Sequence, residues 1–337
     1  MRAIRLKQFG LEGLVVDDVP EPVPGPGELL LRVRAVSLNY RDLLIVRGEY
    51  DPRFPLPLVP CSDAVCDVVA VGAGIDRARI GERVCPNFSR GWQAGPPTRE
   101  TPRRSLGAIE GGTLAELIVT GAEDVVKPPA YLDDVQAATL PCAGLTAYRA
   151  LFEHAQTGPG TRVLVLGTGG VSTFALLLAR AAGADVTVIS RDPEKLERAL
   201  ALGAARGICS ANDPEWGKKV REATGAGVDQ VIDVLGGPTI TESLQAVRPG
   251  GTISLVGSSG GRRGSSAPVS LLPAIMREVR LQGILVGPRS SFLAFVAALE
   301  RFQIRPVIDS TFSFADARKA FEHLESGRVF GKIALVP

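Results

Sequence analysis

Two cysteines and two aspartates lie within seven positions of an otherwise apolar segment, as Cys61, Asp63, Cys66 and Asp67. Thiolates and carboxylates are ligands of zinc, so this pattern raises the question of a metal site. Neighbouring positions on a strand point to opposite faces, however, which keeps adjacent side chains of this segment from sharing one ion. The chain has only two histidines, and this scarcity removes most histidine-based metal or triad chemistry.

A glycine turn carries a second kind of chemistry. A buried strand in the segment VLVLGTGGVS leads into Gly167, Gly169 and Gly170 at the expected start of a helix. Backbone N–H groups and the helix N-terminus can bind a pyrophosphate there, as in dinucleotide-binding folds. Ser172 replaces the third glycine of the usual fingerprint, but serine is small and can cap the helix. A glycine turn without a ligand is the alternative.

The end of the next strand predicts which dinucleotide binds. Ser190 and Arg191 stand there, where NAD-binding proteins usually place an acidic residue that holds the ribose hydroxyls. A hydroxyl and a guanidinium suit the extra phosphate of NADP, which favours NADP(H). Asp192 is explained as the cap of the following helix. The alternative is that Arg191 is simply a solvated residue at a strand end.

The composition is that of a globular protein with two domains. The chain has 337 residues, of which 45% are hydrophobic and 22% charged, and a formal net charge of +2. This length favours two domains, and this small net charge gives no indication of nucleic acid or a membrane as partner. No apolar run is long enough to cross a bilayer, and the start of the chain lacks the apolar core of a signal peptide, so we expect a cytoplasmic protein. Five irregularly spaced cysteines form no disulfide framework.

The order of the expected elements indicates the α/β class. About the first 120 residues contain short strands separated by proline and glycine, whereas strands and helices alternate from about Asp134 onward. Such alternation predicts a doubly wound parallel sheet with helices on both faces. A basic, proline-rich stretch from Arg90 to Arg104 is typical of a long surface loop.

The chain resembles the medium-chain dehydrogenase/reductases over nearly its whole length, through the motifs DVQAATLPCAGLTAYRAL, RVLVLGTGGVSTFALLLARAAGA, VRPGGTISLVG and VFGKIALVP. Within them it looks like the quinone oxidoreductase and enoyl reductase branch. The resemblance implies a β-rich, GroES-like catalytic domain over residues 1–125 and a Rossmann domain that binds NADP(H) over 126–270. It implies that the last segment, 271–337, adds the last Rossmann strands and helices and returns to the catalytic domain. It also implies an active site in the cleft between the domains and a homo-oligomer, usually a dimer.

The expected cofactor contacts combine the residue patterns with this resemblance. The glycine turn, the end of the second strand and the helix after it contribute Gly167, Thr168, Gly169, Gly170, Val171, Ser190, Arg191 and Lys195. The resemblance adds Thr146, Val256, Gly257, Arg289 and Lys332.

The same resemblance argues against a metal. Zinc members of the superfamily hold their catalytic ion with a cysteine near residue 39, a His-Glu pair near residue 61 and a cysteine just before the cofactor-binding strand. This sequence has Asn39 at the first place, Ser62 and Asp63 at the second, and a cysteine, Cys142, only at the last. A catalytic zinc site takes at least three ligands from the protein, so we expect none here. The four cysteines of the structural zinc site are also missing, since only Cys85 lies in that loop.

These features predict a zinc-independent oxidoreductase that delivers hydride from NADPH to a quinone or an α,β-unsaturated carbonyl compound. For such acceptors the protein must mainly hold the nicotinamide beside a small-molecule substrate and offer a donor to the developing charge. The resemblance places Asn39 near the nicotinamide and Tyr40 and Asp42 beside the substrate, and the segments of Asp63 and Cys142 line the same site. Tyr40 is the candidate proton donor, or else a packed aromatic residue at a strand end.

Two other functions stay open. The chain could be an alcohol or aldehyde oxidoreductase that uses hydrogen-bond donors in place of zinc, or an NADP(H)-binding protein without turnover. Cys142 has three interpretations, namely a small core residue, a residue that lines the substrate cleft, and a reactive thiol. No histidine stands nearby in the sequence to activate that thiol, which disfavours the third.

Overall fold

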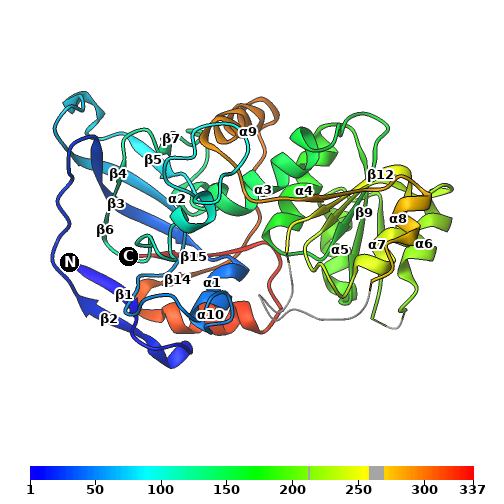
Figure 1. Ribbon diagram of the computed structural model, residues 1–337, viewed down its shortest axis with the longest axis horizontal. Helices are drawn as coiled ribbons and strands as arrows, with labels where there is room; N and C mark the ends of the chain where they lie inside the picture. The colour runs from blue at the N-terminus through cyan, green and yellow to red at the C-terminus, as the bar shows by residue number, and fades with distance from the viewer. Residues whose placement is uncertain (212, 258–268) are drawn as a thin grey trace. The chain divides into compact units, whose positions relative to one another are not determined.

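The computed structural model describes residues 1–211, 213–257 and 269–337, which form two compact units (Figure 1). Unit 1 comprises Met1–Leu145 and Val286–Pro337, and unit 2 comprises Thr146–Leu285. Among the described residues, every helix is too short or too polar to span a membrane.

Unit 2 is built on a six-stranded parallel sheet. Its strands are β8 (Arg162–Leu166), β9 (Asp185–Ser190), β10 (Arg206–Cys209), β11 (Val228–Asp233), β12 (Val247–Leu255) and β13 (Arg280–Gly283). They pair in the order β10-β9-β8-β11-β12-β13, so the chain starts near the centre of the sheet and extends first to one edge and then to the other. This order is typical of doubly wound nucleotide-binding sheets, and it confirms the predicted α/β class.

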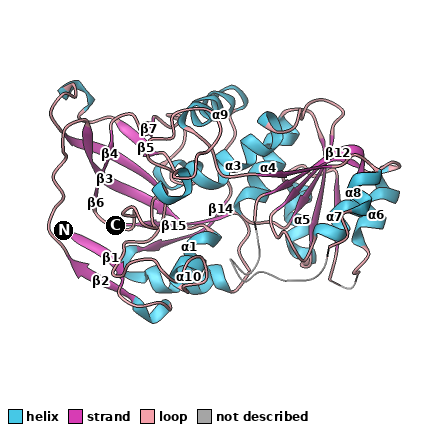
Figure 2. Ribbon diagram, in the orientation of Figure 1, coloured by secondary structure: helices cyan, strands magenta, loops and turns pink. Residues whose placement is uncertain are grey.

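Helices connect these strands and pack on the sheet (Figure 2). They are α4 (Gly170–Ala181), α5 (Pro193–Ala201), α6 (Trp216–Thr224), α7 (Ile240–Ala246) and α8 (Leu272–Met276), preceded by a π-helical turn over Arg149–Glu153. α4 packs on β8 and β9, α5 on β9 and β10, and α6 and α7 on β11 and β12. One core of unit 2 includes Leu164, Val231 and Ile253 from the sheet and Val220 and Leu244 from the helices.

The limits of α5 follow from local sequence signals. The Asp192 carboxylate accepts hydrogen bonds from Glu194 N and Lys195 N, which confirms Asp192 as the predicted cap. Pro193 is the first helical residue, where its missing N–H is not needed. Gly203 follows the helix with a φ of 98°, a conformation that favours glycine.

Unit 1 is rich in strands. These are β1 (Arg2–Leu6), β2 (Leu14–Asp18), β3 (Glu28–Ser37), β4 (Asp63–Val71), β5 (Arg83–Pro86), β6 (Leu117–Gly121), β7 (Val125–Val126), β14 (Ile308–Ser313) and β15 (Lys332–Val336). β1 pairs with β2, and the others form a sheet in the order β14-β15-β3-β4-β5-β7, with β6 paired to β3. The last strand of the chain, β15, therefore lies inside this sheet, next to β3.

Short helices surround this sheet. They are α1 (Tyr40–Val46), α2 (Asp134–Ala137), a π-helical segment over Leu140–Gly144, α9 (Arg289–Phe302) and α10 (Ala317–Glu325), and α3 (Leu145–Tyr148) links the two units. α10 packs against α1, β14 and β15. Its Phe321 is fully buried in a core that also contains Leu43 of α1 and Leu335 of β15.

The division at Leu145 and Val286 differs from the expected one at residues 125 and 270. α2 packs against β3 and β4, which keeps the segment after residue 125 with unit 1. The Tyr131 hydroxyl also lies 2.8 Å from the carbonyl oxygen of Leu299 and 2.7 Å from that of Ile304, both in unit 1.

We expect Phe321→Ala to lower the free energy of unfolding by about 3–5 kcal/mol, because it empties a buried site in the core of unit 1. Denaturant unfolding followed by circular dichroism measures the difference. Phe302→Ala is the matched control, since Phe302 of α9 is 44% exposed and its loss should cost at most about 1 kcal/mol. Equal losses in the two variants would contradict the place of α10 in the core.

Candidate active site

Five polar residues from four distant parts of the chain meet in unit 1. We call them the Asp63 cluster: Asn39, Ser62, Asp63, Cys142 and Lys332. Asp63 Oδ1 accepts a hydrogen bond from Ser62 Oγ at 2.8 Å, and its Oδ2 accepts one from Cys142 N at 3.2 Å. Lys332 Nζ lies 4.0 Å from the same Oδ2 and donates to Asn39 Oδ1 at 2.5 Å. The structure thus brings together three predicted catalytic residues and one predicted cofactor contact.

Strand ends hold the Asp63 cluster in place. Asn39 lies between β3 and α1, Asp63 opens β4, and Lys332 opens β15. Ser37 at the end of β3 pairs with Asp63, and β15 pairs with the same end of β3 on its other side. Cys142 lies in the π-helical segment, a rare conformation that is frequent at functional sites. A single sheet therefore positions most of the cluster.

Two carboxylates and two cations are buried in this region. Asp42 and Asp63 are fully buried, whereas the side chains of Lys332 and Arg41 are 3% and 10% exposed. Arg41 Nη1 lies 3.3 Å from Asp42 Oδ1, and Asn39 N donates to Asp42 Oδ2 at 2.9 Å. Buried charges are costly unless they are paired, so the two cations compensate the two carboxylates.

Burial shifts the pKa values of both carboxyl groups upward. Removal from water raises the pKa of Asp42 to about 6, although the Arg41 guanidinium opposes this shift. Burial also raises the pKa of Asp63, against the opposing effects of the Lys332 charge and of the hydrogen bonds that Asp63 accepts. Carboxyl groups with such shifts are concentrated at functional sites, although structural ion pairs show them as well.

Arg41 was not among the predicted site residues. Its guanidinium donates to the carbonyl oxygen of Leu106 at 3.0 Å and to Ser105 Oγ at 3.3 Å. It also lies over the rings of Phe88 and Tyr50, 4.9 Å and 5.4 Å from their centroids. Phe88 precedes the Arg90–Arg104 stretch, and Ser105 and Leu106 follow it, so Arg41 connects both ends of that stretch to α1.

Tyr40, the predicted proton donor, is 51% exposed as the first residue of α1. Asp42, two positions further on the same helix, is fully buried. The helix therefore directs these two predicted residues to different environments, and only Asp42 joins the buried charges. The role of Tyr40 as a donor stays a prediction.

The cysteines of the CSDAVCD stretch are buried and their thiols are held neutral. Burial raises the pKa of Cys61 and of Cys66, and it also raises the pKa of Cys142. A protonated thiol is a poor nucleophile, which argues against the interpretation of Cys142 as a reactive thiol. Cys61 has a φ of 72°, and its backbone packs so closely on Gly107 that a Cβ there would lie 2.4 Å from the Cys61 carbonyl oxygen.

These residues do not suit a zinc ion. Over the residues that the structure describes, no three His, Cys, Asp or Glu side chains are grouped so that they could hold a metal. In the Asp63 cluster, Asp63 and Cys142 are the two possible ligands, and the Asp63 carboxylate already accepts bonds from Ser62 and from the Cys142 backbone. A catalytic zinc needs three ligands from the protein, and Asp63 and Cys142 alone do not make such a set.

The predicted glycine turn of unit 2 lies between β8 and α4 and fits a pyrophosphate. Gly167 has a φ of 74°, which favours glycine, and a Cβ added to Gly169 would meet no atom within 4 Å. The turn therefore leaves open space beside the helix N-terminus, where an anion is stabilised. Contrary to the expectation from the sequence, Ser172 does not cap α4. Its Oγ donates to the Leu166 carbonyl oxygen at 2.7 Å, and Gly169 is the capping residue. Thr168 lies in the same turn, and Val171 is the second residue of α4.

Ser190 and Arg191 lie at the end of β9, as predicted. Ser190 is buried, and its Oγ accepts a hydrogen bond from Asp192 N at 3.1 Å. Arg191 is exposed, and Lys195 lies in the first turn of α5. The Asp192 carboxylate caps α5 through Oδ1, which accepts from Glu194 N and Lys195 N.

The other predicted cofactor contacts are spread over both units. In unit 2, Thr146 is buried, and Val256 and Gly257 follow β12, where Val256 N donates to the Asp233 carbonyl oxygen at 2.9 Å. In unit 1, Arg289 opens α9, and its Nε donates to the Val125 carbonyl oxygen at 3.0 Å. Contacts of these residues with a cofactor stay predictions.

Two family profiles match the chain. The family described as alcohol dehydrogenase GroES-like domain matches residues 25–130, and the family described as zinc-binding dehydrogenase matches residues 170–301. The first match confirms the predicted GroES-like domain, and the second agrees with the doubly wound sheet of unit 2.

Known relatives match over nearly the whole chain. A zinc-type alcohol dehydrogenase-like protein of Schizosaccharomyces pombe is 39% identical over 94% of this chain and 93% of its own. An acryloyl-coenzyme A reductase of Metallosphaera sedula is 30% identical over 99% of both chains. The crystal structure of a putative alcohol dehydrogenase from Sinorhizobium meliloti 1021 has a TM-score of 0.91 and 38% identity, and the match covers 100% of this chain and 98% of that one. The quinone oxidoreductase of Coxiella burnetii is a more distant structural match, with a TM-score of 0.81 and 26% identity over 100% of this chain and 99% of that one, so membership of the quinone oxidoreductase branch stays a prediction. The chain therefore belongs to the medium-chain dehydrogenase/reductase superfamily of NAD(P)-dependent oxidoreductases.

Proposed function

We propose that the chain is a zinc-independent, NADP(H)-dependent oxidoreductase that interconverts an alcohol and its carbonyl compound. One observation carries this proposal. Asn39, Ser62 and Asp63, at the positions where the zinc enzymes of this superfamily have metal ligands, are joined to one another by hydrogen bonds. The names of the Schizosaccharomyces and Sinorhizobium relatives support the alcohol and carbonyl pair.

The chain's own hydrogen-bond donors must then stabilise the charge on the substrate oxygen that a Lewis acid stabilises in a zinc enzyme. When bound, the nicotinamide supplies hydride to the carbonyl carbon or accepts it from the alcohol carbon. During reduction, negative charge develops on the carbonyl oxygen, and donors that face this oxygen stabilise it. We assign that role to the hydroxyl of Tyr40, a residue that is 51% exposed, and its proton completes the alcohol. The Asp63 cluster contributes by holding the adjoining residue, Asn39, in one conformation.

An activated carbon–carbon double bond is a second candidate acceptor. The Metallosphaera relative is named for acryloyl-coenzyme A, whose acyl group has a double bond conjugated to a carbonyl. Hydride would add to the β-carbon, the oxygen would carry the developing enolate charge, and a proton would complete the reduction at the α-carbon. The same donors serve this reaction, since charge again develops on a carbonyl oxygen.

The preference for NADP(H) rests on the end of β9. Arg191 is exposed there, and a guanidinium matches the geometry of a phosphate. Asp192 is engaged as the cap of α5. Ser190 and Lys195 lie on either side of the same turn and support the arrangement.

Turnover should not need zinc. We expect the purified protein to oxidise NADPH with benzaldehyde, and treatment with EDTA should change the rate by no more than about twofold, because the site lacks three metal ligands. Absorbance of the reduced nicotinamide gives the rate, and plasma mass spectrometry gives the metal content.

Parallel assays with an enal and a quinone rank the acceptors, and faster turnover of the enal would favour the second candidate. Activity that EDTA abolishes and zinc restores would overturn the zinc-free proposal, and tight NADPH binding without any turnover would indicate a binding protein.

We expect Arg191→Ala to weaken NADPH binding by about tenfold or more, since it removes a charge-assisted contact with the extra phosphate, and to change NADH binding by no more than about twofold. Fluorescence titration of each nucleotide measures the two dissociation constants. Lys218→Ala, which removes an exposed cation of α6 in the same unit, is the control and should leave both unchanged. Equal weakening of NADPH and NADH would defeat the assignment of NADP(H).

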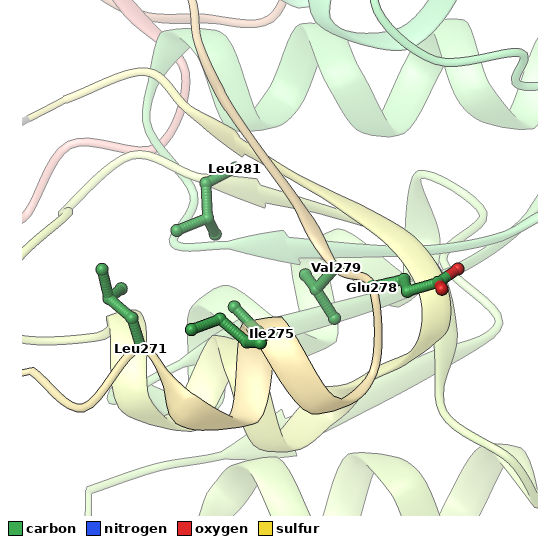
Figure 3. A pocket seen from close by; sticks show the side chains of 6 residues that line it. Leu271, Ile275, Glu278, Val279 and Leu281 are labelled. Carbon is green, nitrogen blue, oxygen red and sulfur yellow. The ribbon is translucent and has the colours of Figure 1, made fainter.

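We also propose that a second copy of the chain covers the surface formed by α8 and β13. Leu272, Ile275 and Met276 of α8 are 60%, 71% and 73% exposed, and Ile275 and Leu281 line a shallow, mainly apolar pocket (Figure 3). β13 is an edge of the six-stranded sheet, and among the described residues no further strand pairs with it. A second copy suits this surface because an edge strand can pair with itself about a twofold axis, which also buries the apolar side chains.

Ile275→Glu should convert such a dimer into a monomer, because it would bury a carboxylate in an apolar interface. Sedimentation velocity of the wild-type and variant chains measures the assembly. Leu200→Glu is the matched control, since Leu200 of α5 is 44% exposed and lies outside this surface, and this variant should remain dimeric. A wild-type chain that sediments as a monomer at every concentration would contradict the proposal.

A further inference from the structure

Lys332 carries a charge where a charge is costly. Its side chain is 3% exposed at the first position of β15. The ammonium donates to the Leu38 carbonyl oxygen and to Asn39 Oδ1, each at 2.5 Å, and Asp63 Oδ2 lies 4.0 Å away. An ammonium has three N–H donors and no acceptor, and its three neighbours here are all oxygen atoms of unit 1.

The contact with the ammonium favours one orientation of the Asn39 amide. It can only donate, so the Asn39 atom that faces it must be the acceptor Oδ1. The amide nitrogen Nδ2 then points to the other side, where it lies 3.5 Å from Ser62 Oγ. The Ser62 hydroxyl gives its proton to Asp63, so it accepts from Nδ2 and selects the same orientation of the amide. Replacement of Lys332 by an apolar residue removes the charged one of these two contacts.

The ammonium also compensates the Asp63 charge. Asp63 is fully buried, and the other cation of the region, Arg41, lies 3.3 Å from Asp42. Removal of one partner from a buried pair leaves an uncompensated charge and is strongly destabilising. Asp63 in turn accepts the bonds that position Ser62 and the Cys142 backbone.

We propose that Lys332 is a positioning residue that supplies the fixed positive charge of the Asp63 cluster, a charge that belongs to the chain itself and not to a metal ion. This inference rests on the proposed zinc-free function. Lys332 orients Asn39 and neutralises Asp63, and it acts on the reaction through these residues. The expected contact of Lys332 with the cofactor is not part of this role, since its donors face Leu38, Asn39 and Asp63.

A double-mutant cycle tests the charge compensation. Lys332→Met alone should lower the Tm, because it leaves Asp63 buried without its cation, and Lys332→Met combined with Asp63→Asn should be less destabilised than Lys332→Met alone. Lys319→Met is the matched control, since the Lys319 side chain is 72% exposed in the same unit, and it should leave the Tm unchanged. Should Lys332→Met not fold, Lys332→Arg with and without Asp63→Asn forms the same cycle, in which loss of Asp63 should destabilise the arginine variant. Additive effects in the cycle would overturn the inference.

Binding and turnover separate positioning from a cofactor contact. Lys332→Met should keep the Kd for NADPH within about twofold of wild type, whereas loss of a direct contact with phosphate would raise it about tenfold. With benzaldehyde as acceptor, kcat should fall about tenfold or more while KM changes little, and Lys332→Arg should recover part of kcat because it keeps the charge. An increase in the NADPH Kd of about tenfold, or an unchanged kcat, would overturn the inference. Bound zinc in the wild-type chain would overturn the proposed function instead, and the cycle would still report whether Lys332 compensates Asp63.

Discussion

The burial of the Asp63 carboxylate is the constraint on which the site of unit 1 depends. A carboxylate removed from water must be matched by donors and by a positive charge. Ser62, the Cys142 backbone and Lys332 meet this need, and they come from three separate parts of the chain. The cluster can therefore form only after β4, the π-helical segment and β15 have reached their places.

The end of the chain is part of unit 1 for the same reason. β15 lies between β14 and β3, and its Ile333 and Leu335 are buried in the core that α10 completes. This packing delivers Lys332 to a position beside Asn39, which precedes α1. Stability and chemistry are thus linked in unit 1, since the apolar residues of the last strand hold the residue that neutralises the site.

Unit 2 is organised by local contacts, whereas the Asp63 cluster of unit 1 joins distant parts of the chain. Its glycine turn leaves open space at the start of α4, and the loop after β11 is held by one buried carboxylate, Asp233. Asp233 accepts bonds from the backbone of Leu235 and Gly236 and from the hydroxyls of Thr239 and Ser243. All these partners lie within ten positions of Asp233, so the loop at the carboxyl end of β11 is organised by local contacts.

Local signals in the sequence determined the α/β class, the glycine turn and the cap at Asp192, because each depends on residues within one strand or one helical turn. The resemblance to the medium-chain dehydrogenase/reductases, and not a local signal, identified Asn39, Asp42 and Cys142 as residues of interest, and the pattern of cysteines and aspartates drew attention to Asp63. Only the tertiary structure decided that Lys332 joins Asn39 from 293 positions away and that Ser172 binds the Leu166 carbonyl oxygen instead of capping α4. Periodicity reports which face of an element is apolar, but it carries no information on which strand lies beside which. The pairing of β15 with β3 is therefore what turned a lysine near the end of the chain into the buried cation of the Asp63 cluster.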